Sequence, residues 1–191
     1  ISKNEFGISS PKAYVDFIFE RIQQQVDQSN GRAAIAKTLA DIENNKRKGT
    51  LSVMLGIENG LALEGDISNV EYFAEKGITY ITLCHNGDND ICDSAKGVGT
   101  IGGLSEFGRQ VVKEMNRLGV LIDLSHAAQS TFYDVISITE KPVVCSHSNC
   151  YSLCPHPRNI TDDQMRLLAK NGGVMQITMY NGFLREDGKA T

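Results

Sequence analysis

The sequence has 191 residues, of which 41% are hydrophobic and 22% are charged, and its formal net charge is -4 at pH 7. This length and balance suit a single globular domain over residues 1–191 with a sizeable core. The negative charge gives no support to a nucleic-acid or anionic-membrane surface. No apolar run is long enough to span a bilayer, and no signal peptide is visible at the N-terminus.

The first fifty residues are polar and are predicted to be helical. Pro11 can begin a helix, and the apolar residues after it recur at helical spacing until Gly31. A second helix is expected over residues 33–48, with Gly49 closing it.

From residue 50 the pattern changes to short apolar runs that alternate with amphipathic segments. Strands are expected at residues 51–57, 79–83, 120–124, 142–145 and 174–179. Helices are expected between them, near residues 67–76, 105–118, 127–138 and 161–171. Continuous apolar strands joined by helices predict parallel pairing buried on both faces, which is an α/β fold.

A titratable residue follows each of the first four predicted strands: Glu58, His85, His126 and His147. In a closed parallel barrel the carboxyl ends of all strands meet at one mouth, where such folds place their chemistry. An open doubly wound sheet brings together only a few strand ends, so a (β/α)8 TIM-type barrel is favoured. A full barrel needs about 250 residues. The sequence offers about five βα units plus N-terminal helices. The predicted barrel is therefore incomplete, either because the chain is a fragment or because partner material completes it.

Three of these strand-end residues are candidate metal ligands. A carboxylate such as Glu58 can bind one metal or bridge two, although an exposed loop glutamate is the simpler alternative. His126 and His147 occupy equivalent positions on successive strands, and neutral imidazole is a common transition-metal ligand. The alternatives for these histidines are helix caps or hydrogen-bonded core residues. Asp123 precedes His126 on the same strand and is interpreted as a buried, hydrogen-bonded carboxylate rather than a partner of a ligand.

His85 is interpreted as a ligand or as a hydrogen-bond donor to charge that develops on a substrate, with a structural role at the start of a loop as the alternative. The loop over residues 86–103 is long enough to cover an active site. Its acidic run resembles part of a calcium loop, but the EF-hand spacing is incomplete.

Arg158 lies in the loop after the fourth strand, where a guanidinium can hold a substrate carboxylate through two hydrogen bonds. A surface salt bridge or a charge that flanks a helix is the alternative. The surrounding stretch, CSHSNCYSLCPHPRN, contains three of the five cysteines, so one disulfide remains open. A structural zinc knuckle there is disfavoured because the paired spacing of common zinc sites is missing.

Several motifs together resemble the renal (membrane) dipeptidase family: GIENG, ITLCHN, GLSEFGRQVVKEMNRLGVLIDLSH and PVVCSHSNCYSLCPHPRNITDDQMRLLAKNGGVMQI. The resemblance covers about residues 51–180. It implies a binuclear zinc hydrolase on a (β/α)8 barrel that cleaves dipeptides. By motif, Glu58 resembles the carboxylate that bridges both zinc ions, and His126 and His147 resemble ligands of the second zinc. His85 resembles the histidine that contacts substrate and stabilises the tetrahedral intermediate, and Arg158 the arginine that holds the substrate carboxylate.

Two parts of the family pattern do not occur in this sequence. The resemblance implies that a His-x-Asp pair holds the first zinc, and no His-x-Asp occurs here. It also implies a catalytic aspartate on a late strand, beyond the last residue of this sequence. The leading hypothesis is hydrolysis of a dipeptide by a hydroxide held between two zinc ions in the complete protein. The alternatives are hydrolysis of another small amide, a lactam or a D-amino-acid derivative, and a non-catalytic barrel. A homodimer is compatible with the sequence.

Overall fold

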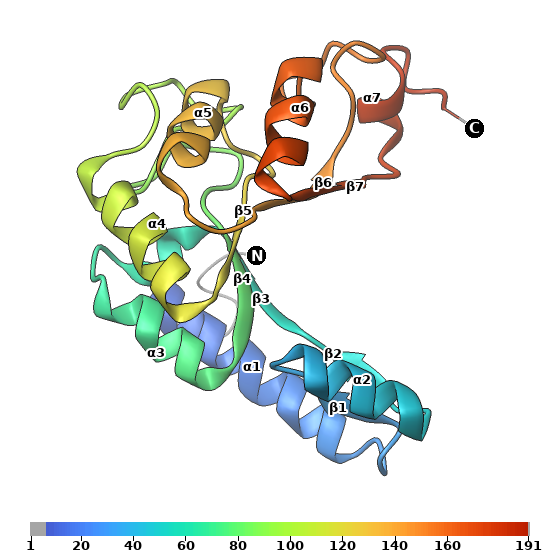
Figure 1. Cartoon of the computed structure of the whole chain (residues 1–191). Coiled ribbons are helices and arrows are strands. Elements are labelled where there is room, and N and C mark those ends of the chain that lie inside the picture. The colour runs from blue at the N-terminus through green and yellow to red at the C-terminus, as the bar shows by residue number, and fades with distance from the viewer. Residues whose placement is uncertain (1–6, 191) are drawn as a thin grey trace.

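The computed structural model describes residues 7–190, which form an α/β fold (Figure 1). The helices are α1 (Pro11–Asp27), α2 (Leu39–Lys48), α3 (Ser68–Lys76), α4 (Glu106–Leu118), α5 (Gln129–Ile138), α6 (Asp162–Asn171) and α7 (Asn181–Leu184), with a 3-10 helix η1 (Gly60–Leu63). The strands are β1 (Ala33–Ile35), β2 (Leu51–Val53), β3 (Leu55–Glu58), β4 (Ile78–Thr82), β5 (Leu121–Asp123), β6 (Val144–Ser148) and β7 (Val174–Ile177).

The main sheet contains five parallel strands in the order β3-β4-β5-β6-β7. Helices α3, α4, α5 and α6 connect successive strands, and each of these helices packs against the next. This arrangement confirms the predicted α/β series of about five units. Among residues 7–190, β3 and β7 each pair with one neighbour in this sheet, so the described strands form an open sheet rather than a closed ring.

The N-terminal region differs from the sequence prediction. Residues 33–48 were expected to form one helix, but Ala33–Ile35 is strand β1, which pairs in parallel with β2. Helix α2 begins only at Leu39, because Thr38 and Asp41 form a capping box that starts a new helix there. Gly49 ends α2 at a φ of 68°, as predicted. The apolar spacing across residues 33–42 therefore combined a short strand with the first turn of a helix.

Two other predicted boundaries are wrong. The single strand expected at residues 51–57 is divided at Met54 into β2 and β3, which belong to different sheets. Helix α1 ends at Asp27 rather than near Gly31. An apolar run on its own does not reveal that the chain leaves one sheet and enters another.

Glycine ends three helices of the main sheet where the sequence predicts it. Gly77, Gly119 and Gly172 have φ values of 92°, 72° and 82°, in the left-handed region that favours glycine. A strand begins one or two residues after each of them. These turns set where each strand starts and therefore which residue stands at its carboxyl end.

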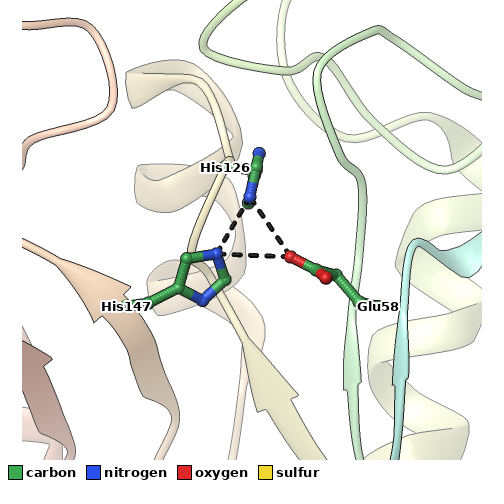
Figure 2. A group of neighbouring side chains, drawn as sticks. All are labelled: Glu58, His126 and His147. Atoms are coloured by element: carbon green, nitrogen blue, oxygen red, sulfur yellow. Dashed lines mark hydrogen bonds and ion pairs between the residues drawn. The ribbon is translucent and has the colours of Figure 1, made fainter. Parts of the chain in front are cut away.

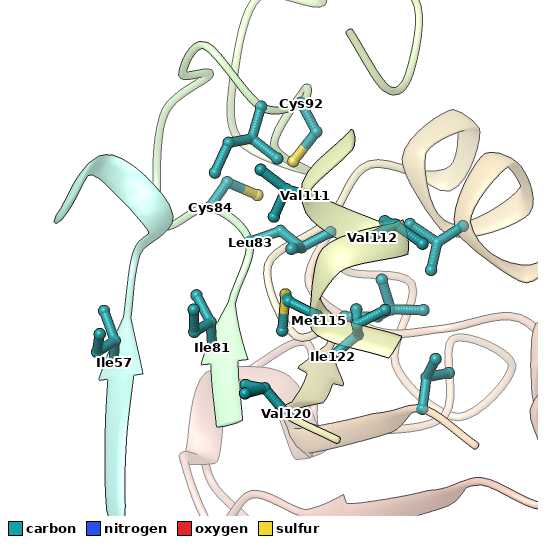
Figure 3. Close-up of a cluster of buried hydrophobic side chains, with 14 of the residues drawn as sticks. Ile57, Ile81, Leu83, Cys84, Cys92, Val111, Val112, Met115, Val120 and Ile122 are labelled. Carbon is teal, nitrogen blue, oxygen red and sulfur yellow. The ribbon is translucent and has the colours of Figure 1, made fainter. Parts of the chain in front are cut away.

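The core between the sheet and its helices is continuous and apolar. Figure 3 shows Val111, Val112 and Met115 of α4 among Ile81 of β4 and Ile122 of β5, and all five are nearly or fully buried. Full burial of an aliphatic side chain of this size stabilises the fold by about 1.5–3 kcal/mol. This packing fixes the position of the strands and therefore of the polar side chains at their carboxyl ends. Within residues 7–190, no helix has both the length and the apolar character needed to cross a membrane.

Candidate metal centre

Glu58, His126 and His147 meet at the carboxyl end of the main sheet, as Figure 2 shows. Glu58 is the last residue of β3, His126 follows β5, and His147 lies near the end of β6. Glu58 Oε1 is 3.4 Å from His126 Nε2 and 3.3 Å from His147 Nε2. The two Nε2 atoms are 2.9 Å apart. The sequence predicted these residues as neighbours, and the fold brings them together.

The spacing of these three atoms fits a tetrahedral metal. Ligand atoms about 2.0 Å from a tetrahedral ion lie about 3.3 Å from one another, close to the three distances found here. Two imidazole nitrogens 2.9 Å apart repel each other if both present a lone pair. A proton shared between them, or a cation bound by both, removes this repulsion. Within residues 7–190, this is the one group of at least three histidine, cysteine or acidic side chains whose ligand atoms are close enough to hold a metal.

Both histidines are held in the neutral form that binds metals. Burial, together with the nearby Arg158 and His85, lowers the pKa of His126 to about 3. Burial is also the main cause that lowers the pKa of His147 below its usual value, followed by Arg158. Because the imidazoles remain neutral, each can offer a nitrogen lone pair to an ion.

The backbone at His126 is in a left-handed conformation, with a φ of 73°. This region is uncommon for a residue other than glycine. Two groups of the loop after β4 hold the His126 carbonyl: the amide of Ala95 donates to it at 2.7 Å, and the Ser94 hydroxyl at 3.3 Å. The same hydroxyl also donates to the carbonyl of His85. Ser94 thus connects the backbones of two site histidines, a contact that the sequence did not reveal.

The acidic residues of this loop organise its backbone. Asp88 accepts hydrogen bonds from the amides of Ser94, Val98 and Gly99. Asp93 accepts from three further amides, those of residues 101, 102 and 103. These carboxylates are therefore engaged by the backbone amides of their own loop.

His85 lies beside the cluster of three and not within it. Its Nε2 is 3.9 Å from Glu58 Oε1, and its ring centroid is 4.3 Å from that of His126. The side chain is 43% exposed, so one side of it remains open to a ligand. Glu58 and His85 line a cavity of about 450 Å³, whose apolar wall includes Tyr14 and Leu61. His85 is therefore placed where it can contact a ligand that binds beside the cluster.

Arg158 is buried, with 3% of its surface exposed, so the surface salt-bridge interpretation is wrong. Its Nη2 donates to the carbonyl of His147 at 3.3 Å, and its guanidinium lies 5.6 Å from the centre of the Phe183 ring. Burial lowers the pKa of Arg158. Within residues 7–190 no carboxylate forms an ion pair with it. Arg158 lines a cavity of about 280 Å³ together with His126 and His147, so its charge is available to an anionic ligand near the cluster.

Asp123 is fully buried and accepts four hydrogen bonds, which supports its interpretation as a buried, hydrogen-bonded carboxylate. One donor is the hydroxyl of Ser146, which also contacts His147. Ser146 was missed because nothing in the sequence distinguishes a serine before a strand-end histidine from an ordinary strand residue.

The cysteine-rich stretch forms neither of the structures left open for it. All five cysteines are free thiols. His156 accepts a hydrogen bond from the Arg158 amide through Nδ1 and packs its ring 4.4 Å from that of Phe183. In the described part of the chain these residues do not gather into a zinc knuckle.

Two histidines and one carboxylate at the strand ends of a parallel α/β fold form a donor set that suits a divalent metal ion. Residues 17–191 match the sequence pattern of the family described as Membrane dipeptidase (Peptidase family M19). The chain belongs to this family.

Curated relatives agree with this assignment. An uncharacterized dipeptidase of Schizosaccharomyces pombe is 38% identical over 154 residues, which cover 78% of this chain and 36% of the relative. Dipeptidase verJ of Clonostachys rogersoniana is 33% identical over 181 residues, which cover 93% of this chain and 47% of the relative. The chain thus spans between a third and a half of the length of these proteins.

Solved structures share the fold. The probable dipeptidase PvdM of Pseudomonas aeruginosa matches with a TM-score of 0.85 and 28% identity, over 87% of this chain and 44% of that protein. A metallo peptidase of Rhodobacter sphaeroides, liganded with a phosphinate mimic of the dipeptide L-Ala-D-Ala, matches with a TM-score of 0.83 and 26% identity. That match covers 90% of this chain and 50% of the other.

Proposed function

We propose that the complete protein is a metal-dependent dipeptidase and that this chain supplies part of its active site. The observation that carries the proposal is the cluster of Glu58, His126 and His147, whose ligand atoms lie 2.9–3.4 Å apart beside a cavity that also contains Arg158. The family assignment and the dipeptide mimic bound by the Rhodobacter sphaeroides relative support dipeptides as the substrate class.

The proposed cofactor is a pair of zinc ions. Glu58 would bridge the two ions, and His126 and His147 would ligate the second. When bound, zinc lowers the pKa of a water molecule to about 7 and polarises the scissile carbonyl. The His-x-Asp pair proposed for the first zinc does not occur in this sequence. The activity is therefore proposed for the complete protein, in which residues 1–191 would form part of one barrel domain.

Two further residues would position the substrate. His85 stands next to Glu58 with an exposed side chain, where it can donate a hydrogen bond to the oxygen that becomes negative during peptide-bond cleavage. Arg158 would bind the free carboxylate at the C-terminal end of the dipeptide. A buried guanidinium without a carboxylate partner gains most from such a ligand, because the ligand supplies the missing opposite charge. This requirement for a nearby free carboxylate favours short peptides over long ones.

Hydrolysis of another small amide is the second candidate. An amidohydrolase of Pseudomonas aeruginosa matches this chain with a TM-score of 0.82 and 33% identity, over 87% of this chain and 50% of that protein. A panel of dipeptides, lactams and D-amino-acid amides, with and without a free carboxylate, separates the two candidates. Faster hydrolysis of substrates that lack the carboxylate would contradict the dipeptidase proposal.

The decisive experiment is zinc analysis of the active, complete protein. We expect two zinc equivalents, loss of activity on chelation and recovery on addition of zinc. Replacing Glu58 by Gln keeps the size of the side chain but removes the charge that would bridge the ions, so the variant should bind less zinc and lose activity by at least about 100-fold. Fewer than two equivalents in fully active enzyme would disprove the binuclear site. No activity with any zinc content would favour a non-catalytic barrel.

A further inference from the structure

The carboxylate of Asp123 is a buried hydrogen-bond acceptor with a different set of donors on each oxygen. Oδ1 accepts from two backbone amides, those of Ser125 at 3.0 Å and Ser146 at 2.9 Å. Oδ2 accepts from two hydroxyls, those of Thr82 at 2.6 Å and Ser146 at 2.5 Å. An ionised carboxylate can only accept hydrogen bonds, so the proton of the Ser146 hydroxyl points toward Asp123.

The direction of this hydrogen bond determines the next one. Ser146 Oγ also lies 2.7 Å from Nδ1 of His147. Because the serine proton is already given to Asp123, the serine oxygen can only accept from the imidazole, and Nδ1 must carry the imidazole proton. Nε2 of His147 is then unprotonated, and this is the atom that lies 3.3 Å from Glu58 Oε1 and 2.9 Å from His126 Nε2.

We propose that Ser146 and Asp123 are positioning residues that fix His147 in the tautomer with Nε2 free for the metal. The influence of Asp123 on the site thus passes through the hydroxyl of Ser146. The consequence for metal binding rests on the proposed function, in which His147 is a ligand. The tautomer of His147 is already set in the metal-free protein and can be measured there. Partners of this kind orient the histidine ring and make the ligand nitrogen available.

The structure provides a matched control in Thr82. Its hydroxyl donates to the same Asp123 oxygen as that of Ser146, and it comes from β4 on the other side of β5. Within the described residues, no hydrogen bond joins Thr82 to a histidine. Replacing Thr82 by Val therefore removes one donor from the carboxylate and leaves the contact between Ser146 and His147 in place.

A substitution at Asp123 should reverse the chain of hydrogen bonds. In Asp123→Asn, the amide oxygen is expected to stay at the Oδ1 position, where it keeps both backbone donors. The amide nitrogen then takes the Oδ2 position and donates to Ser146, which releases the serine proton toward Nδ1 of His147. The imidazole proton would move to Nε2, so Asp123→Asn should change the tautomer without removing the serine.

The first test is nitrogen NMR of the histidine rings in the metal-free, complete protein at a pH at which His147 is neutral. In the wild type, Ser146→Thr and Thr82→Val, we expect His147 to carry its proton on Nδ1. In Ser146→Ala we expect loss of this preference, and in Asp123→Asn we expect the proton on Nε2. An unchanged tautomer in Ser146→Ala, or in Asp123→Asn if the alanine variant does not fold, would overturn the proposal.

The second test is zinc affinity, measured by competition with a chelator. Ser146→Ala and Asp123→Asn should weaken zinc binding by about 10–100-fold, the range typical for loss of a partner of a metal-bound histidine. Ser146→Thr should restore the affinity, and Thr82→Val should change it by less than about threefold. If Thr82→Val weakens zinc binding as much as Ser146→Ala does, then the number of hydrogen bonds to Asp123 matters and the contact of Ser146 with His147 does not. This outcome also overturns the proposal.

The two proposals fail in different ways. If the tautomer follows the variants as described but the wild-type protein binds no zinc, the proposed function fails and the tautomer assignment stands. If the protein binds two zinc ions and cleaves dipeptides while Ser146→Ala keeps the wild-type tautomer and affinity, the positioning role fails and the proposed function stands.

Discussion

The carboxyl end of the main sheet and the N-terminal region of α1, β1, α2 and β2 use polar residues in opposite ways. In the N-terminal region, polar side chains find partners within the protein: Thr38 and Asp41 cap α2, and Asp16 of α1 pairs with Lys76 of the neighbouring helix α3. At the carboxyl end of the main sheet, a buried charge lacks an ion-pair partner within residues 7–190 and one backbone conformation is unfavourable. Within residues 7–190, Arg158 is buried and forms no ion pair with a carboxylate, and His126 has a left-handed backbone.

This difference separates residues whose polar groups are satisfied within the fold from residues that we propose bind a ligand. A capping box satisfies its own backbone, so nothing is left for another molecule to bind. A buried charge and an unusual backbone conformation both cost stability, and such costs gather at functional sites. Substitutions in the N-terminal region should therefore change stability alone. Substitutions at the carboxyl end of the main sheet should change activity with little loss of stability.

The largest expected effect on stability is at the packing contact between α1 of the N-terminal region and α3, which covers the main sheet. Phe73 of α3 is fully buried and packs edge-to-face on Phe19 of α1, with ring centroids 6.3 Å apart. Phe73→Ala should lower the free energy of unfolding by about 3–5 kcal/mol, measured by urea denaturation of the complete protein. Leu39→Ala is the control, because Leu39 is 71% exposed and its removal should cost less than about 0.5 kcal/mol.

The next effect should appear in activity. Arg158→Met removes the charge proposed to hold the substrate carboxylate, and a hydrogen bond to a charged group contributes about 1.5–3 kcal/mol. The KM for dipeptides should rise about 10–150-fold, while the free energy of unfolding stays the same or increases. Arg158→Lys keeps the charge but not the planar guanidinium, so its KM for dipeptides should lie between those of the wild type and Arg158→Met. An unchanged KM in Arg158→Met would remove the role assigned to this residue.

A smaller effect is expected at the start of α2. Thr38→Ala removes the hydroxyl that accepts from the amide of Asp41, and loss of such a cap costs about 0.5–2 kcal/mol. Thr38→Ser should retain most of the stability. Steady-state kinetics should be unchanged in both variants, and a clear fall in kcat would show that the N-terminal region contributes to the site after all.

The smallest effect is expected for the ion pair between Asp16 and Lys76, whose side chains are 23% and 34% exposed. Lys76→Met should cost less than about 1 kcal/mol, because solvent and salt screen a pair at this exposure. The difference from wild type should shrink further at high salt, as measured by thermal unfolding at two ionic strengths. A salt-independent loss would indicate that the lysine contributes through packing on the ring of Tyr72 instead.

Much of the fold could be predicted because its signals are local. Gly119 and Gly172 end helices through a backbone conformation that other residues rarely adopt, so their positions fix the following strands. The N-terminal error has an equally physical cause. Strand β1 has three half-buried residues, and only pairing with β2 distinguishes it from a helical turn.

The candidate site was predictable in its main members but not in their supporting contacts. Glu58, His126 and His147 follow recognisable strands, so their convergence depends only on parallel topology. Ser94 and Ser146 act through single hydrogen bonds that depend on how loops and strands meet in three dimensions. The sequence around a serine does not predict such a hydrogen bond. The ligand and substrate roles remain predictions for the experiments described above.

The strand order of the main sheet follows the order of the chain. During synthesis, each βα unit can therefore dock on the unit made just before it, without waiting for a distant segment. Of the three clustered residues, Glu58 of β3 is made first and His147 of β6 is made last. The cluster of Glu58, His126 and His147 can therefore form only after β6 has been added to the strands made before it.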